Sequence, residues 1–465
     1  MNSVGVVERL TGSPKAAFFL AIVLAAAVGV GLAGWGDASV MLAITVFCIV
    51  LWVLTPISPA YTGLLGIALI GLAFSTDLAL TGFESPATWL IGFGLLMGEA
   101  TRRSGLASWI GQWLLKRSVP ASLTDGLRAY RRALLALSLA AHLLAFFIPS
   151  ALIRVLVLAP ILIEVGENFE SRKAKVGLFL GPIFASWYGS SGILTADLPN
   201  IIISGMGRSI GDHTITWSEW LFHMYPIMGL TRVFLVVAVV YVLFRPPAGS
   251  GVDITTGSLP DPTGTERRML VFLLLGVGIW VTDFVHGFHP VTGAVVVVAL
   301  AFLPGIGVAD FESAGSDVDF TLLFFYAAVF AIGDGLAHTG FTDDAATSIL
   351  DVIPSDAHLA VILSIVFLTA IGLSFFMEGL AVASVLTPVV ISYAEAAGLP
   401  MTPVLMAEAI ALSAYFFPYQ SAVLIVILAQ DVVDTRELIR TTAACSLATI
   451  VFLVPLQFLL FSVLY

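Results

Sequence analysis

The stretch FFIPSALIRVLVLAP, residues 146–160, decides the fold, because it places one arginine in an apolar run between two prolines. It lies in an apolar segment of about 33 residues, 133–165, too long for one membrane span of about 20 residues and too short for two spans with a turn. A re-entrant hairpin that turns near Pro149 and Ser150 resolves this conflict, since non-helical backbone is tolerated at membrane depth where protein or water surrounds it. Arg154 then lies just past the hairpin tip, near the middle of the membrane.

The composition is that of an integral membrane protein. Of 465 residues, 59% are hydrophobic and 11% are charged, and long apolar segments recur along nearly the whole chain. The net charge of -11 comes from acidic residues scattered over loops, and nothing indicates nucleic acid as a partner. Two cysteines and seven dispersed histidines predict neither a disulfide framework nor a metal cluster. No nucleophile and base pair is visible, so an enzyme is not expected.

Basic residues predict which loops face the cytoplasm. Seven of the twenty lie between Arg102 and Arg132 and three between Arg172 and Lys175, on either side of the first hairpin. Residues 269–435 contain no lysine or arginine, so a second hairpin in this half should enter from outside. We therefore expect a multi-pass protein of the cytoplasmic membrane with its N-terminus in the cytoplasm and its C-terminus outside.

The two halves of the chain repeat the same features in the same order. Glu99 after a glycine matches Asp334 after a glycine, and Pro160 after the first hairpin tip matches Pro388 after the second. A broken helix follows each hairpin at a similar separation. Each half would hold five spans and one hairpin, and an odd number of spans turns the second copy upside down, as in secondary transporters.

These patterns predict an all-α polytopic membrane protein built from inverted repeats of five spans and one hairpin each, with two broken helices. Its predicted organisation by residue number is an N-terminal helix (1–39), a first repeat (40–244) with a hairpin (about 133–165) and a broken helix (about 177–204), a cytoplasmic linker (245–268), and a second repeat (269–465) with a hairpin (about 358–393) and a broken helix (about 404–430).

The breaks at mid-membrane predict the binding site, because unwound backbone frees carbonyls for cations and helix N-termini for anions. Arg154 costs about 2.5–3.5 kcal/mol at a helix centre, and its guanidinium suits a carboxylate or an oxyanion. The alternatives are an ion pair with Glu378 or Asp197, or snorkelling towards an interface. Glu378 could carry a proton, help to bind sodium, or neutralise Arg154.

Candidate site residues fall into two groups. The first group would bind the substrate: Ser150, Ala151, Arg154, Asn200, Gly379, Gln420 and Ser421. The second would hold a coupling ion or proton: Ser150, Thr195, Asp197, Glu378 and Tyr419. A sodium ion is possible near Ser150 and Glu378, and no other cofactor and no catalytic residue are expected.

The order and spacing of these features resemble the divalent anion:sodium symporter family, within the larger ion transporter superfamily. The resemblance spans nearly the whole chain and rests on IGFGLLMGEATRRSGLASWIGQWLL (91–115), on the two hairpins followed by proline, and on the two broken helices, the first with LPNIII (198–203). It implies a homodimer in which a scaffold holds two transport domains that move in an elevator-like way. Such proteins carry dicarboxylate, citrate or sulfate, usually with sodium.

This chain departs from that family at both hairpin tips. Members typically have Ser-Asn-Thr there, where residues 150–152 read Ser-Ala-Leu and residues 378–380 read Glu-Gly-Leu. We expect Arg154 to supply anion recognition instead, and Glu378 or Asp197 to shift the coupling towards protons. The stretch FPYQSAVLIV is similar to sulfate-type relatives and favours a small oxyanion or sulfonate.

The predicted function is secondary transport of a small anion of the sulfate, sulfonate or dicarboxylate type, coupled to sodium or protons. A cation/proton antiporter and an uncoupled anion channel on the same scaffold are the alternatives.

Overall fold

The computed structural model describes residues 14–54, 57–118, 125–253, 261–350 and 357–465. Within these ranges the ordered elements are helices, and extended backbone is paired in a single isolated bridge between Phe169 and Val252. The prediction of an all-α protein is confirmed.

Helix length and composition are those of a polytopic membrane protein. Among the described residues, four helices are long and apolar enough to cross a membrane, and two further helices that meet at a bend of 66° could make a fifth span. Several shorter apolar helices accompany them. The four are Gly126–Phe146, Trp217–Phe244, Gly379–Ala396 and Thr435–Leu464, and the bent pair is Phe311–Asp317 with Leu322–His338.

The N-terminal helices pack on α18, a helix from the second half of the chain. Small residues allow this approach: a Cβ at Gly63 would lie 2.6 Å from the carbonyl oxygen of Phe324, and one at Gly82 would collide with the carbonyl of Ala327. The helices that pack on α18 (Leu322–His338) are α3 (Asp37–Leu54), α4 (Pro59–Ala73) and α5 (Thr76–Glu84), while α2 (Pro14–Gly31) packs on α3.

The basic region of the first half is largely helical rather than a loop. Gly105, with φ of 80°, ends α6 (Pro86–Ser104) and is followed at once by α7 (Leu106–Ser118). Asp125 caps α8 (Gly126–Leu143) by accepting hydrogen bonds from two backbone N–H groups. Local capping thus extends the helices beyond the ends of the apolar segments.

The chain turns back after α8. One turn of 3-10 helix follows, and α9 (Ala151–Glu167) begins after the turn at residues 147–150. The next helix, α10 (Arg172–Tyr188), packs against both arms of this hairpin. It breaks after Tyr188, and the chain resumes as α11 (Leu198–Ser209) after two short 3-10 turns.

The remaining helices complete the fold. They are α12 (Trp217–Met224), a π-helical stretch η5 (Tyr225–Thr231), α13 (Arg232–Phe244), α14 (Gly264–Val281), α15 (Asp283–His286), α16 (Pro290–Ala301), α17 (Phe311–Asp317), α19 (Phe341–Leu350), α20 (Leu359–Ser374), α21 (Gly379–Ala396), α22 (Met401–Leu412), α23 (Ala422–Leu428), α24 (Thr435–Ala448), a second π-helical stretch η7 (Thr449–Leu453) and α25 (Val454–Leu464).

The elements from α6 to α13 recur in the same order from α18 to α25. Each series has a long helix, a shorter helix, a hairpin, a broken helix, and a final helix with a π-helical stretch. Pro160 lies nine residues after the first residue of α9 (160 − 151), and Pro388 lies nine residues after that of α21 (388 − 379). The parallel between the halves therefore extends to single positions.

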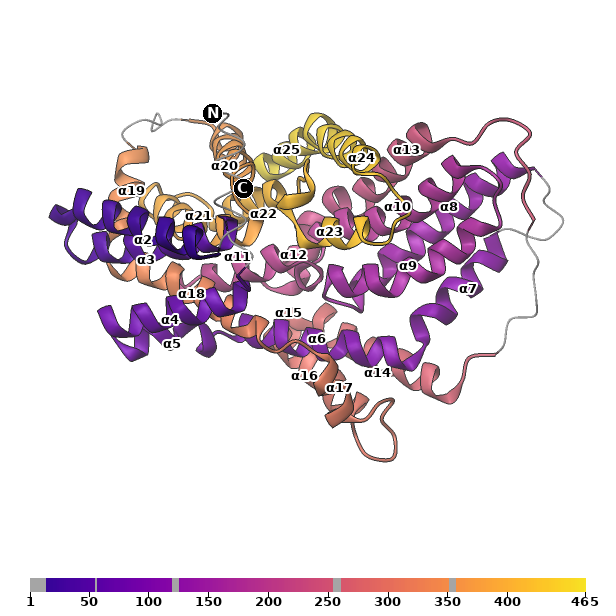
Figure 1. The fold of residues 1–465 in the computed structure, drawn as a ribbon, viewed down its shortest axis with the longest axis horizontal. Coiled ribbons are helices and arrows are strands. Elements are labelled where there is room, and N and C mark those ends of the chain that lie inside the picture. Colours follow the sequence, from indigo (N-terminus) through magenta and orange to yellow (C-terminus); the bar gives the residue numbers. More distant parts are fainter. Residues whose placement is uncertain (1–13, 55–56, 119–124, 254–260, 351–356) are drawn as a thin grey trace.

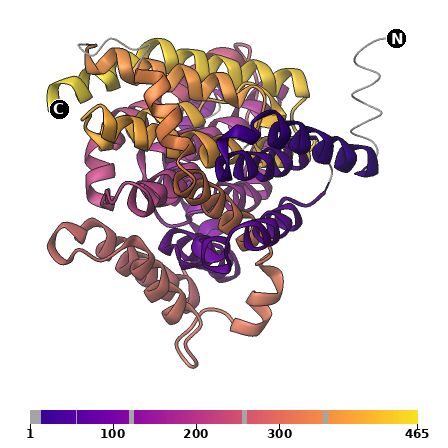
Figure 2. The same cartoon turned by 90° about the vertical axis from the view of Figure 1, so that its left-hand side faces the viewer.

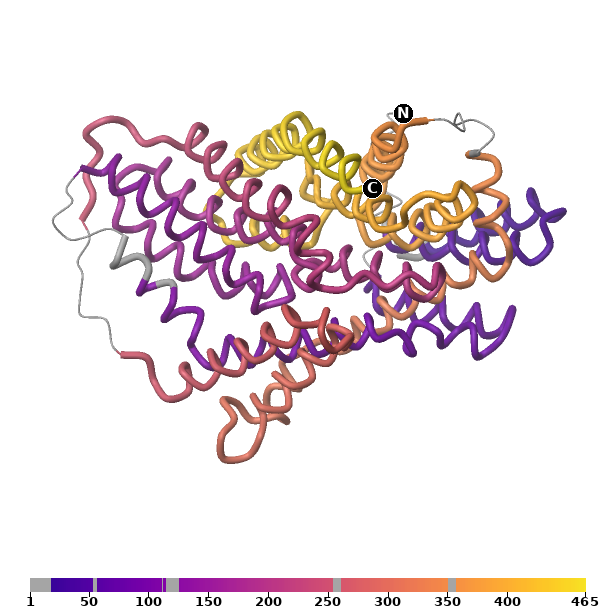
Figure 3. The backbone as a smooth tube through the Cα atoms, turned by 180° about the vertical axis from the view of Figure 1, so that it is seen from behind, coloured from indigo at the N-terminus to yellow at the C-terminus, as the bar shows by residue number. Residues whose placement is uncertain are grey.

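The hairpin tips and helix breaks lie in the middle of the molecule. Figure 1 shows α7 to α10 and α13 at one end of the long axis and α2 to α5 with α18 and α19 at the other. Seen from behind, α13 runs along α8 and α10, which it contacts (Figure 3). The side view places the C-terminal helices and α14 to α17 on opposite sides (Figure 2).

Candidate functional site

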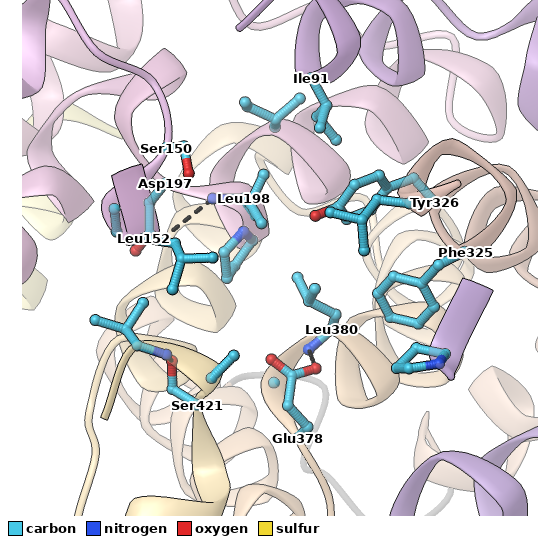
Figure 4. A pocket seen from close by; sticks show the side chains of 18 of the residues that line it. Ile91, Ser150, Leu152, Asp197, Leu198, Phe325, Tyr326, Glu378, Leu380 and Ser421 are labelled. Carbon is cyan, nitrogen blue, oxygen red and sulfur yellow. Dashed lines mark hydrogen bonds between the residues drawn. The ribbon is translucent and has the colours of Figure 1, made fainter. Parts of the chain in front are cut away.

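A cavity of about 280 Å³ lies where the two hairpins and the two helix breaks meet. Residues 149–152 and 378–381 of the hairpins line it, together with residues 197–199 and 421–423 of the breaks. Figure 4 shows side chains from all four segments around this cavity. The structure therefore brings together the four segments from which the site residues were predicted.

The four segments each contribute the N-cap residue of a helix. The side chains of Ser150, Asp197, Glu378 and Ser421 accept hydrogen bonds of 2.9 to 3.3 Å from backbone N–H groups at the start of their helices. The helices after the first three are 17, 12 and 18 residues long, so each has a positive dipole end of about half an elementary charge at the cavity. Such ends attract negative groups.

Two carboxylates supply the charge on the cavity wall. Asp197 and Glu378 both line it, and no lysine, arginine or histidine occurs among the described residues that do so. Each carboxylate also caps a helix, so its charge offsets the positive dipole of that helix end. A bound anion would meet two negative charges here unless a proton or a cation binds with it.

Arg154 lies behind the cavity wall and is 1% exposed. Its NH1 donates to the carbonyls of Ile148 at 2.6 Å and Ala196 at 3.1 Å, and NH2 donates to that of Ser186 at 3.5 Å. No ion pair within 4.0 Å joins it to an acidic side chain in the part of the chain that the structure describes. Contact between Arg154 and the substrate stays a prediction, and it would require the guanidinium to leave these carbonyls.

A second buried arginine, Arg232, was missed by the sequence analysis. It is 0% exposed, and its NH1 donates to the hydroxyls of Ser191 at 3.0 Å and Ser413 at 2.7 Å. Its NH2 donates to the Ser413 carbonyl at 2.8 Å, and the guanidinium carbon lies 4.8 Å from the ring centroid of Tyr188. Arg232 thus ties the first helix break to the second. A lone charge in an apolar helix, the signal that identified Arg154, was available for it too.

Glu408 carries the same signal and was also missed. It is completely buried in α22, where its Oε1 accepts a hydrogen bond from Thr387 at 2.9 Å and its Oε2 has no hydrogen-bond partner among the described residues. It does not line the cavity.

Two predicted site residues shape the first break without lining the cavity. Asn200 Nδ2 donates to three backbone carbonyls of the break at 3.1 to 3.4 Å. Thr195 Oγ1 accepts a hydrogen bond from the Trp217 indole at 3.1 Å. Both side chains are buried, and they hold unwound backbone in place.

Two others shape the second break. Gln420 Oε1 accepts hydrogen bonds from two backbone N–H groups of the break at 2.7 and 2.8 Å, and its Nε2 donates to the Ser374 carbonyl at 2.8 Å. Tyr419, which is 53% exposed, donates its hydroxyl to the Phe375 carbonyl at 2.8 Å. These contacts fasten the second break to the tip of the second hairpin.

Six predicted residues do line the cavity: Ser150, Ala151, Asp197, Glu378, Gly379 and Ser421.

Aromatic rings make up much of the remaining wall, and sequence analysis did not single them out. Trp187 and Tyr415 stack with centroids 4.2 Å apart, and Phe325 packs beside Tyr326 at 5.3 Å and Trp52 at 5.1 Å. These rings come from four distant parts of the chain. They offer mainly apolar contact and a small number of hydrogen-bond donors.

The sequence predicted a possible sodium ion near Ser150 and Glu378. The described residues contain no group of three or more His, Cys, Asp or Glu that could hold a metal ion. A sodium ion near Ser150 and Glu378 would therefore use hydroxyl, carboxylate and backbone oxygens, the ligands that hard cations prefer. Both residues line the cavity, and the sodium site stays a prediction.

Comparison with known proteins adds a family and a fold. The model of a family described as "Citrate transporter" matches residues 49–412. The L-tartrate/succinate antiporters of Shigella dysenteriae serotype 1 (strain Sd197) and Escherichia coli (strain K12) are each 24% identical to this chain, over 366 and 365 residues. Both alignments cover 75% of this chain and 72% of the relative.

Among solved structures, the YdaH transporter of Alcanivorax borkumensis, whose crystal structure is described as having an unusual topology, is similar to this chain. The TM-score is 0.56 at 15% sequence identity, and the match covers 84% of this chain and 88% of YdaH. At this identity the likeness concerns the fold alone.

Proposed function

The chain belongs to the citrate transporter family, and from this premise we propose that it carries a small carboxylate across the cytoplasmic membrane by secondary transport. The family and the curated relatives are transporters rather than enzymes. The match supports a place in the ion transporter superfamily and does not single out the divalent anion:sodium symporters. Because the relatives are named for tartrate and succinate, we propose a carboxylate in preference to the sulfate or sulfonate that the tyrosine-glutamine pair favoured.

The observation that carries this proposal is the meeting of both hairpin tips and both helix breaks at one cavity lined by Asp197 and Glu378. Three positive helix ends favour an anion, while the two carboxylates oppose it. Two unit charges about 4 Å apart interact by roughly 4 kcal/mol at an effective dielectric constant near 20. Binding of a proton, or of a sodium ion, would remove this repulsion. We propose that such binding couples the ion gradient to anion transport.

We further propose that the recurring series of helices are inverted repeats. Arg103 near the end of α6 pairs with Asp317, just before α18, at 2.7 Å, whereas Pro86 at the start of α6 and His338 at the end of α18 line one pocket. The matched helices α6 and α18 therefore run in opposite directions. This arrangement supports alternating access, because each repeat presents to one side of the membrane the surface that the other repeat presents to the opposite side.

The distribution of basic residues along the chain supports the proposed orientation. Lysine and arginine are concentrated in residues 102–132, 172–175 and 245–268. Residues 269–435 and the C-terminal residues after Arg440 contain neither. We propose that the basic segments are cytoplasmic, that the C-terminus is external, and that the protein works as a homodimer with elevator-like motion.

Uptake into liposomes tests this function. Purified protein is reconstituted, and accumulation of labelled succinate, tartrate, citrate and sulfate is measured with an inward proton gradient, an inward sodium gradient, or unlabelled anion inside. We expect at least one carboxylate to accumulate above protein-free liposomes under at least one of these conditions. No accumulation of any carboxylate under all three conditions contradicts the proposal.

A cation/proton antiporter is the second candidate, favoured by the fact that both charged side chains lining the cavity are acidic. It predicts proton movement when sodium or potassium is added in the absence of any carboxylate. A pH-sensitive dye inside the liposomes reports this movement. Proton flux that depends on added carboxylate instead supports the anion transporter.

A further inference from the structure

Two buried arginine side chains donate hydrogen bonds to backbone oxygens at the helix breaks and the first hairpin tip. In transporters with broken helices, unwound carbonyls and half-helix C-terminal ends commonly hold the coupling cation. Here the carbonyls of Ile148 at the first hairpin tip and Ala196 in the first break converge on one guanidinium nitrogen of Arg154, at 2.6 and 3.1 Å. The Ser186 carbonyl, near the C-terminal end of α10, lies 3.5 Å from its other terminal nitrogen.

An arginine from a different helix, Arg232 in α13, contacts the second break in the same manner. Ser413 is the first residue after α22, so its carbonyl belongs to a half-helix C-terminal end. Arg232 reaches it from α13 at 2.8 Å and also contacts the hydroxyls of Ser413 and Ser191 at 2.7 and 3.0 Å. One guanidinium therefore joins oxygens from both breaks, as a shared inorganic cation could.

Neither arginine is placed for a surface role. Both are at most 1% exposed, neither lines the cavity, and neither forms an ion pair within 4.0 Å among the described residues. Burial of an unpaired charge is costly, and here the cost is offset by hydrogen bonds from the guanidinium to backbone and hydroxyl oxygens. A sodium ion at the same oxygens would displace the guanidinium and face its like charge.

We propose that Arg154 and Arg232 are tethered cations that fill the cation-binding positions of the two helix breaks, so that transport does not depend on sodium. This inference rests on the proposed function and deepens it, because it assigns the coupling to protons on the cavity carboxylates or to exchange with a counter-anion. Asp197 and Glu378, which line the cavity, remain free to bind a proton with the substrate.

The first test replaces sodium in an assay that does not need a cation gradient. Exchange of labelled for unlabelled carboxylate is measured in liposomes with sodium, potassium or choline chloride at equal ionic strength and pH. We expect the same apparent affinity in all three salts, without the roughly 5- to 150-fold change typical of coupled ligands. A change of that size on adding sodium overturns the inference. Absence of exchange in every salt contradicts the proposed function and leaves the inference to the second test.

The second test is independent of transport. Melting of the purified full chain is followed in sodium, potassium and choline chloride, and in methylguanidinium chloride at the same low concentration. The wild type should melt at the same temperature in all four salts. Arg154→Ala should melt lower and recover selectively with methylguanidinium or sodium, because a ligand of the folded state raises apparent stability.

Two variants keep the second test decisive. Arg154→Lys retains a tethered cation, so its melting temperature should not change with the added salts. This variant can be tested even if Arg154→Ala does not fold. Arg103→Ala removes an arginine from an ion pair outside the breaks, so its melting should not recover selectively with either cation. Equal recovery of Arg103→Ala and Arg154→Ala, or selective stabilisation of the wild type by sodium, overturns the inference.

Discussion

Arg232 connects two parts of the chain that each lack regular hydrogen bonding. Its terminal nitrogens satisfy a hydroxyl of the first break and both a hydroxyl and a carbonyl of the second. Arg232→Ala should lower the free energy of unfolding substantially, since each buried group left without a partner costs roughly 1–3 kcal/mol. Thermal melting in detergent measures this. Arg245→Ala, which removes an exposed arginine next to the Tyr241 ring, is the control and should have little effect.

Glu378 is placed to link protons to transport. It lines the cavity at the tip of the second hairpin, where its charge opposes a bound anion. Uptake of tartrate, which stays fully ionised near neutral pH, should increase in the wild type as external pH falls. Glu378→Gln resembles the protonated side chain, so its uptake should lose most of this pH dependence.

The control for that experiment is Glu395→Gln, which changes an exposed carboxylate near the end of the same helix. It should keep the pH dependence of the wild type. If Glu378→Gln keeps the pH dependence of uptake, Asp197 becomes the candidate for linking protons to transport. Unchanged pH dependence in both Glu378→Gln and Asp197→Asn would contradict protonation of the cavity carboxylates.

His289 precedes α16 in the connection from α15, and we expect it to make the stability of the protein depend on pH. Burial, with a contribution from the charge of Arg208, lowers the pKa of His289 to about 4, against roughly 6.5 for the unfolded chain. Its Nδ1 accepts a hydrogen bond from Val291 N at 3.2 Å, which requires the neutral ring. Between these two values the unfolded chain binds a proton that the folded chain does not, so the free energy of unfolding falls as the pH falls from about 6.5 to 4.

His289→Asn should reduce this loss, because asparagine also caps helices but does not titrate. Melting temperatures at pH 7 and pH 5 measure the difference, with His338→Asn, at an exposed position, as the control. An equal drop in the wild type and His289→Asn would contradict this role of His289.

At the scale of elements, glycines set how closely the first helices approach α18. A Cβ at Gly82 in α5 would collide with the Ala327 carbonyl, whereas a Cβ at Gly372 in α20 would meet nothing within 4 Å. Gly82→Ala should therefore destabilise the protein by about 1–3 kcal/mol through overpacking. Gly372→Ala is the matched control and should be neutral or slightly stabilising. Equal melting temperatures for the two variants would show that α5 can shift without cost.

The helix starts at the cavity were readable in part from sequence, because Ser150, Asp197 and Ser421 are residue types that commonly cap helices. The exact helix ends were less readable. Apolar run length predicted the first hairpin at 133–165, while Asp125 begins its first helix at Gly126. Because Asp125 caps this helix, the helix includes polar residues that hydropathy alone assigns to a loop.

At the scale of the whole molecule, the proposed elevator motion predicts which contacts must change. We propose that the hairpins, the broken helices and the final helices of the two series move together past α6 and α18. Ser209 Oγ in α11, part of the first broken helix, lies 3.1 Å from Asp334 Oδ1 in α18, so these two residues would lie in different moving bodies. A cysteine pair at these two positions, in a chain whose buried Cys48 and Cys445 are replaced by alanine, allows a short thiol cross-linker to join them. Cross-linking should stop uptake, and cleavage of the linker should restore it.

The control pair lies within one proposed body. Arg172 at the start of α10 and Glu437 in α24 form an ion pair at 2.5 Å, and both helices would move together. Cysteines at these positions, joined by the same linker, should leave uptake intact. Loss of uptake with the control pair, or retained uptake with the first, would contradict the assignment of these helices to two bodies.

The sequence by itself determined what depends on composition and local pattern. Hydropathy requires helices in lipid, two apolar segments of irregular length indicate turns inside the membrane, and the glycine and proline matches predict two related halves. Asp197 and Glu378 could be named as site residues because ionisable groups are rare in such segments and draw attention wherever they occur.

The tertiary structure alone decided which of these groups share a cavity and which lie behind it. Arg154 and Arg232 carry the same signal in sequence as Glu378, yet their guanidiniums point to backbone oxygens and the carboxylate lines the cavity. The aromatic wall formed by Trp187, Tyr415 and their neighbours likewise brings together helices far apart in the chain. Side-chain direction and long-range packing depend on the positions of neighbouring helices, which no local pattern encodes.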